Sequence, residues 1–121
     1  MNIFENYLSK ISKIIIDNKD HLKLKNVEKL NIVNLEVPPS HINFDLSTNI
    51  SLVLSKANKI EPKTLANNIK NLLLKKIHHF EKIDIAGPGF LNIKFSKEGL
   101  AININDIFRN KRSYGSKKSK G

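Results

Sequence analysis

Hydrophobic residues recur every three or four positions in four separate segments, which is the spacing of one face of an α-helix. The first segment covers residues 3 to 16 and the second covers residues 50 to 57. The third begins at Pro62, which a first helical turn tolerates, and reaches Lys76. The last covers residues 97 to 109. We therefore predict four amphipathic helices, each packed on another part of the fold.

Between these helices the pattern changes to the alternation and β-branched composition of strands. Residues 30 to 37 and residues 42 to 46 are predicted as two short extended segments. Residues 83 to 86 and 90 to 95 alternate in the same way and are separated by Gly87-Pro88-Gly89. Turn residues between two alternating runs predict a β-hairpin.

The predicted order of elements is therefore α-β-β-α-α-β-β-α. Ser47 or Thr48 is the predicted N-cap of the second helix, because hydroxyl side chains are favoured at that position. Strands that can pair as hairpins, with helices separate from them in sequence, are typical of an α+β domain. We expect two layers, in which helices cover one face of a small, mostly antiparallel sheet of about four strands.

Charge modifies this picture, because the 121 residues carry a formal charge of +10 at pH 7. Six cations and no acid lie between Arg109 and Gly121, so residues 1 to 108 carry +4. We expect residues 1 to 108 to form the domain and residues 109 to 121 to form a basic, flexible linker. A strongly basic chain favours a polyanionic partner, and nucleic acid is the commonest one.

The sequence offers little for catalysis, metal binding or membrane insertion. The absence of cysteine excludes thiol chemistry and cysteine-ligated metals, and the adjacent His78 and His79 do not have the spacing of a metal site. Gly87-Pro88-Gly89 lacks the third glycine of a phosphate-binding loop. No segment has the composition of a membrane span or secretion signal. We expect a cytoplasmic chain with no catalytic residue, metal or cofactor of its own.

The second strand of the predicted hairpin is the most informative segment. Alternation places Phe90, Asn92 and Lys94 on the face opposite the predicted core residues of this strand. An aromatic ring can stack on a base, an amide can bind a base edge and an ammonium can meet a phosphate. This face is therefore a candidate RNA-binding surface, although three solvent-facing residues of a purely structural strand would have the same pattern.

Four short motifs follow one another along the chain. They are Asp45-Leu46-Ser47-Thr48-Asn49, Leu54-Ser55-Lys56-Ala57, Ala86-Gly87-Pro88-Gly89-Phe90-Leu91-Asn92 and Tyr114-Gly115-Ser116. In this order and spacing they resemble the N-terminal additional domain of arginyl-tRNA synthetase, over roughly residues 3 to 118.

The resemblance implies an RNA target, namely the D-loop side of the elbow of arginine tRNA. The stretch from Gly87 to Asn92 corresponds to the family's D-loop contact, so Phe90, Asn92, Lys94, Gly87 and Gly89 are the predicted RNA-binding residues. Asp45, Thr48 and Asn49 belong to a second family motif. We interpret these three first as residues that cap a helix and fix a loop, with direct RNA contact as the alternative.

The resemblance also implies a catalytic domain as partner. Neither the His-x-Gly-His signature nor the Lys-Met-Ser-Lys-Ser loop of class I synthetases occurs in the sequence. ATP and arginine are therefore expected to bind only to that other domain, in an ATP-dependent arginine–tRNA ligase. Residues 109 to 121 would then lead toward the catalytic domain.

Two other functions remain open at this stage. The chain can be a docking module that positions a catalytic partner without reading RNA, or a basic domain that binds RNA without specificity. A general single-stranded RNA binder fits less well, because Asn92 and Ile93 do not reproduce the aromatic strand of RNA-recognition motifs.

Overall fold

The structure is a computed structural model that describes the backbone of residues 3 to 120 and the side chains of residues 3 to 108. The predicted α+β class and order of elements are confirmed. The elements are α1 (Ile3–Asp17), the 3-10 helix η1 (Glu28–Ile32), β1 (Leu35–Glu36), β2 (Leu46–Thr48), α2 (Ile50–Asn58), α3 (Pro62–Lys76), β3 (Phe80–Ala86), β4 (Phe90–Phe95) and α4 (Lys97–Lys120).

The four strands form one antiparallel sheet in the order β1-β2-β4-β3. The predicted hairpin is its β3–β4 pair, which begins earlier than expected, at Phe80. Phe80 pairs with Phe95, and the pairing register shifts at an irregularity between Phe80 and Lys82. Both phenylalanines are buried, so β3 includes core residues that precede the alternating residues 83 to 86.

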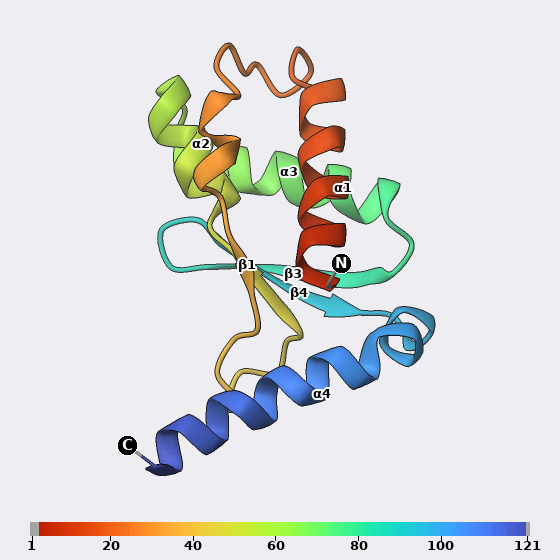
Figure 1. Ribbon diagram of the computed structural model, residues 1–121. Coiled ribbons are helices and arrows are strands. Elements are labelled where there is room, and N and C mark those ends of the chain that lie inside the picture. Colours follow the sequence, from red (N-terminus) through yellow and green to blue (C-terminus); the bar gives the residue numbers. More distant parts are fainter. Residues whose placement is uncertain (1–2, 121) are drawn as a thin grey trace.

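One face of the sheet carries the helical layer of α1, α2 and α3 (Figure 1). Residues from all three helices meet the inward residues of the strands in a single core. The largest fully buried side chains include Ile11, Ile15, Leu46, Ile50, Leu54, Leu65, Ile69, Leu73, Ile83, Leu91 and Ile93. Helical periodicity predicts these helices well because each buries one apolar face against the sheet.

The two short strands lie at other positions than the sequence predicts. Residues 30 to 37 were expected to be extended, but η1 occupies their first part, and only Leu35–Glu36 pairs as β1. The expected strand at residues 42 to 46 is displaced to Leu46–Thr48. Neither displacement has a local signal, because the pairing partner of β2 is β4, far along the chain.

The last helix, α4, lies below the sheet in Figure 1, away from the other helices. Its predicted end was near residue 109, whereas its backbone continues to Lys120. Residues 109 to 120 contain one glycine and no proline, so no strong helix breaker ends the helix early. Their role as a linker stays a prediction, and their side chains lie outside the described part.

Tyr7 of α1 joins α4 to the rest of the fold. The Asn103 amide donates to the Tyr7 hydroxyl at 2.9 Å, and this hydroxyl lies 2.8 Å from Nδ1 of His79. Burial raises the pKa of Tyr7 above its ordinary value, and the Asn103 hydrogen bond acts in the opposite direction.

Among residues 3 to 120, no helix combines the length and apolar content needed to cross a bilayer.

Candidate nucleic-acid interface

Strand β4 has the two faces that its alternation predicts. Leu91, Ile93 and Phe95 are buried in the core. Phe90 points to the other side and is 38% exposed. Asn92 and Lys94 follow on the same outward face and are half-buried. The structure therefore brings together Phe90, Asn92 and Lys94 in the predicted order.

The turn before Phe90 depends on two glycines with positive φ. Gly87 has φ +56° and Gly89 has φ +145°, both in the region that favours glycine. A Cβ atom on Gly89 would lie 3.3 Å from Cβ of Pro62, so this end of the turn packs on the start of α3. A Cβ atom on Gly87 would meet no atom within 4 Å. Of the two predicted glycines, Gly87 is thus the one beside open space.

Strands β2 and β3 add polar neighbours to the outward face. Ser47 and Asp84 lie opposite Asn92, one on each side, and Lys82 lies opposite Lys94. Sequence reasoning did not include these three residues. Alternation along β3 was a usable signal for Lys82 and Asp84, whereas Ser47 had none because the register of β2 depends on long-range pairing.

The two lysines of this face are partly held by neighbouring side chains. The Lys94 ammonium donates to Oδ1 of Asn43 at 3.4 Å. The Lys82 ammonium lies 5.9 Å from the ring centroid of Phe44, a cation–π distance. Both cations therefore lie beside the segment of residues 43 and 44, which precedes β2.

Asp45, which begins the Asp45-Leu46-Ser47-Thr48-Asn49 motif, has a structural role in the described fold. It is only 8% exposed, and its carboxylate accepts a hydrogen bond from the backbone N–H of Phe95 at 2.8 Å. Its own N–H donates to the carbonyl of Ile93 at 2.9 Å. Asp45 thus connects the segment before β2 to the end of β4 through two hydrogen bonds.

Thr48 and Asn49 also form hydrogen bonds within the fold. The Thr48 hydroxyl donates to the carbonyl of Asn34 at 2.7 Å and accepts from the N–H of Ile50 at 3.2 Å. The Asn49 side-chain oxygen accepts from the N–H of Asn34 at 2.9 Å. The N-cap position of α2 is Asn49 rather than Ser47 or Thr48, yet Thr48 still satisfies an N–H of the first turn. These contacts account for both residues structurally; RNA contact by them stays a prediction.

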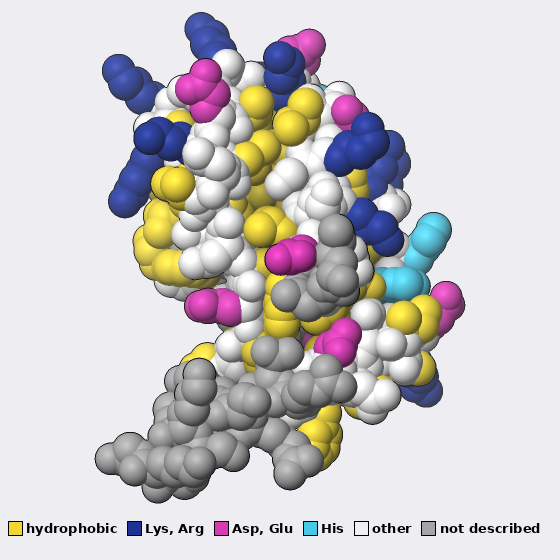
Figure 2. Space-filling model, in the orientation of Figure 1, with side chains coloured by type: hydrophobic (Ala, Val, Ile, Leu, Met, Phe, Trp, Pro, Cys, Tyr) yellow, Lys and Arg dark blue, Asp and Glu magenta, His cyan; other side chains and the backbone are white. Residues whose placement is uncertain are grey.

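Positive charge lies mainly on the helical layer rather than on the outward sheet face. Dark-blue side chains spread over the upper part of Figure 2, around α1 and α2. The lysines of the helical layer and its connectors are Lys10, Lys13, Lys19, Lys23, Lys25, Lys29, Lys56, Lys59, Lys63, Lys70, Lys75 and Lys76. On the sheet, Lys82 and Lys94 are accompanied by Glu36 and Asp84. The outward face is therefore suited to stacking and hydrogen bonding more than to purely electrostatic attraction.

Among the described residues, no group of three His, Cys, Asp or Glu side chains is placed to hold a metal ion. The Asn92 amide and the Phe90 ring are the groups of β4 with the means to recognise a base.

Comparison with known proteins gives a consistent result. A family model described as the arginyl tRNA synthetase N terminal domain matches residues 2–95. The arginine–tRNA ligase of Pelagibacter ubique is 44% identical over 116 residues, covering 95% of this chain and 20% of that protein. The arginine–tRNA ligase of Mesoplasma florum is 40% identical, covering 96% of this chain and 20% of that protein. That of Rickettsia felis is 32% identical, covering 94% and 19%. The chain thus spans about one fifth of the length of these relatives.

Proposed function

The chain belongs to the family of arginyl-tRNA synthetase N-terminal domains, and from this premise we propose that it is a tRNA-binding module that recognises the D-loop side of the elbow of arginine tRNA. The observation that carries the proposal is the outward face of β4, where Phe90 stays 38% exposed beside Asn92 and Lys94. An exposed aromatic residue next to an amide and a cation has the chemistry of a single-nucleotide binding site.

Each of the three side chains has a distinct part in this proposal. Phe90 stacks on an unpaired base of the loop, which removes one face of the base and of the ring from water. Asn92 hydrogen-bonds the edge of the same base, because an amide offers both a donor and an acceptor. Lys94, two residues further along the strand, meets the phosphate backbone and positions it without reading sequence.

The proposal extends to the remainder of the synthetase. The matching relatives are arginine–tRNA ligases about five times as long as the part that this chain covers. We place the binding of ATP and arginine, and the attachment reaction, in a catalytic domain outside the matched region. The N-terminal module would hold the tRNA elbow while that domain acts on the acceptor end. A role in protein biosynthesis predicts a cytoplasmic location.

Substitution of Phe90 tests the proposal on the protein side. Stacking on one aromatic residue contributes about 1–3 kcal/mol, so Phe90→Ala should weaken binding to arginine tRNA roughly 5- to 150-fold in a fluorescence titration. Ile32→Ala is the matched control, because Ile32 is 58% exposed but lies on η1. An unchanged affinity for the Phe90 variant, or an equal loss for both variants, would remove Phe90 from the binding site.

A docking module is the second candidate, and α4 is the observation in its favour. Ile102 is 64% exposed and Ile104 is 45% exposed on this helix, so it offers apolar side chains to another protein domain, although residues two apart lie on different sides of a helix. The two functions differ in what the isolated chain binds. A docking module without base recognition would bind arginine tRNA and an unrelated tRNA equally, through lysine charge alone.

A further inference from the structure

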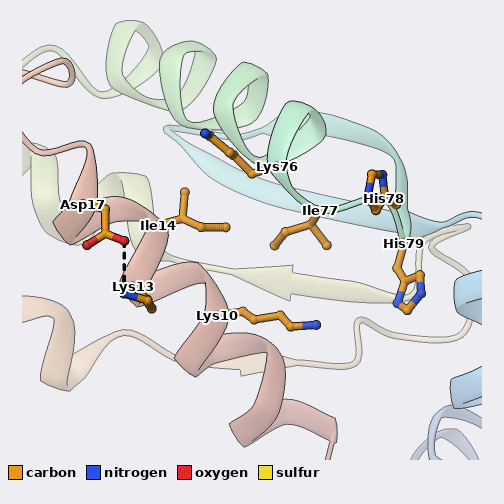
Figure 3. Close-up of a pocket in the computed structure, with 8 residues that line it drawn as sticks. All are labelled: Lys10, Lys13, Ile14, Asp17, Lys76, Ile77, His78 and His79. Carbon is orange, nitrogen blue, oxygen red and sulfur yellow. Dashed lines mark hydrogen bonds and ion pairs between the residues drawn. The ribbon is translucent and has the colours of Figure 1, made fainter.

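A hollow of about 350 Å³ lies between α1 and the segment that joins α3 to β3. It belongs to the helical layer and includes no residue of the outward face of β4. Figure 3 shows Ile14 of α1 and Ile77, which follows α3, directed toward one another in its middle. Ile77 is 4% exposed and Ile14 is half-buried, so the floor of the hollow is apolar.

The rim of the hollow carries positive charge that the described residues do not neutralise. Lys13 is paired with Asp17 at 3.2 Å, which leaves no net charge on that pair. Lys10 and Lys76 also line the hollow, and no described carboxylate lies within ion-pair distance of either. Both are exposed. Figure 3 shows them on opposite sides of the two isoleucines, with the ammonium groups pointing in different directions.

The two histidines of the hollow differ in their availability. His79 is bonded through Nδ1 to the Tyr7 hydroxyl at 2.8 Å, and its Nε2 lies 3.8 Å from Oε1 of Glu98. It therefore forms a wall of the hollow. His78 is exposed at the edge, and its ring can donate a hydrogen bond to a ligand.

A ligand that fits this arrangement has negative charge at two separated points and a less polar part between them. The geometry points to a binding site for a short stretch of nucleic-acid sugar–phosphate backbone, with two phosphates at Lys10 and Lys76 and the intervening sugar over Ile14 and Ile77. This site is separate from the face around Phe90, so it is a second RNA contact rather than part of the first.

Lys76 has an additional structural reason for its position. It lies in the last turn of α3, where cations are favoured by the carbonyl ends of the helix. Lys10, in the middle of α1, is not at a helix end, but its ammonium lies 5.5 Å from the ring centroid of Tyr7, a cation–π distance. The two lysines must therefore be tested together and Lys10 also by itself.

Hexauridylate is a suitable probe because it offers backbone without base pairing. In an NMR titration of the isotope-labelled chain, we expect the largest shift changes at the backbone signals of Ile14, Ile77 and His78. Lys10→Gln combined with Lys76→Gln should weaken binding about tenfold, and Lys10→Gln alone should account for part of that loss. Lys19→Gln with Lys25→Gln removes the same charge from two other exposed positions and should change the affinity less than twofold.

Three outcomes would overturn the inference. The first is an equal loss of affinity for hexauridylate in both double lysine variants, which would mean that affinity depends only on the total charge of the chain. The second is a set of shift changes confined to residues outside the hollow. The third is equal affinity and equal shift changes with hexaglutamate, which would show an acidic-peptide site instead. Phe90→Ala should leave the shifts at the hollow unchanged, so failure here is distinguishable from failure of the proposed function.

Discussion

Asp45 shows how much one buried carboxylate can determine at the scale of a residue. Its side chain accepts from the N–H of Phe95, which is 50 positions away in sequence. The sequence motif around Asp45 allowed either a structural role or RNA contact. The 8% exposure and the 2.8 Å hydrogen bond support the structural role, which was the first interpretation, but no local pattern could have specified Phe95 as the partner.

Substitutions of Asp45 should therefore affect stability. Asp45→Ala leaves the buried N–H of Phe95 without its acceptor, and we expect the free energy of unfolding to fall by about 1–3 kcal/mol in urea denaturation. Asp45→Asn keeps a side-chain oxygen that can accept the same bond, so its loss should be smaller. Equal stability of the alanine variant and the original chain would contradict this role.

The residues of β4 illustrate the opposite case, in which local sequence was sufficient. Period-two alternation alone predicted which side chains of this strand are buried and that Phe90, Asn92 and Lys94 share a face, as observed. It did not predict Ser47 beside Asn92, because that contact depends on pairing between β2 and β4.

At the scale of elements, the turn between β3 and β4 distinguishes two glycines that look equivalent in sequence. A side chain at Gly87 would be strained only by the backbone φ of +56°, because no atom lies within 4 Å of its Cβ position. A side chain on Gly89 also meets Pro62, in a backbone conformation with φ +145°.

Alanine at these two positions should therefore have unequal effects. We expect Gly87→Ala to cost about 1–2 kcal/mol and Gly89→Ala to cost more, about 2–3 kcal/mol, in chemical denaturation. Each variant is the control for the other, because both remove a turn glycine. A larger loss for Gly87→Ala would show that the packing of the turn on α3 is not as described.

The start of α3 was predicted from Pro62, but its N-cap was not. The Glu61 carboxylate accepts hydrogen bonds from the N–H of Thr64 at 2.8 Å and from the N–H of Lys63 at 3.1 Å. The hydrogen bond from the Thr64 hydroxyl lowers the pKa of Glu61 most, and the two backbone hydrogen bonds lower it further. Glutamate is not among the favoured N-cap residues, which is why composition gave no signal.

The lowered pKa of Glu61 makes a prediction about pH. Because the folded-state pKa lies below the unfolded one, the cap stabilises the fold above the unfolded value, and this is lost as pH falls through the folded value. Glu61→Ala should therefore lower the melting temperature at pH 7, and the difference from the original chain should shrink as the pH falls below 4.5, the ordinary pKa of a glutamate. Glu81→Ala, at an exposed position of β3, is the control. A difference that persists unchanged at low pH would contradict the role of the charged cap.

Across the whole molecule, the lysine-rich surface of the helical layer is separate from the outward face of β4. Lysines are spread along the chain, so their concentration on the helical layer emerged only when α1, α2 and α3 came together on one face of the sheet. The order β1-β2-β4-β3 was likewise beyond local patterns, since β2 joins the hairpin through long-range pairing. Helices, fold class and the hairpin were predictable because each has a signal within about twenty residues.

The basic segment from residue 109 onward supports a prediction at this scale. It contributes six cations and no acid. Removal of residues 109 to 121 should reduce the slope of log affinity against log salt, by about 0.7–0.9 for each cation that contacts phosphate. Preference for arginine tRNA should stay the same. Loss of preference together with the segment would place recognition there instead.

The most direct test of the central claim is a binding titration of this chain at two salt concentrations. The three ligands are arginine tRNA, the same tRNA with its D-loop bases substituted, and an unrelated tRNA. We predict a preference for the unaltered arginine tRNA that persists at the higher salt concentration, because stacking and base hydrogen bonds are less sensitive to salt than phosphate contacts. Equal affinity for all three, falling steeply with salt, would contradict elbow recognition by the β4 face.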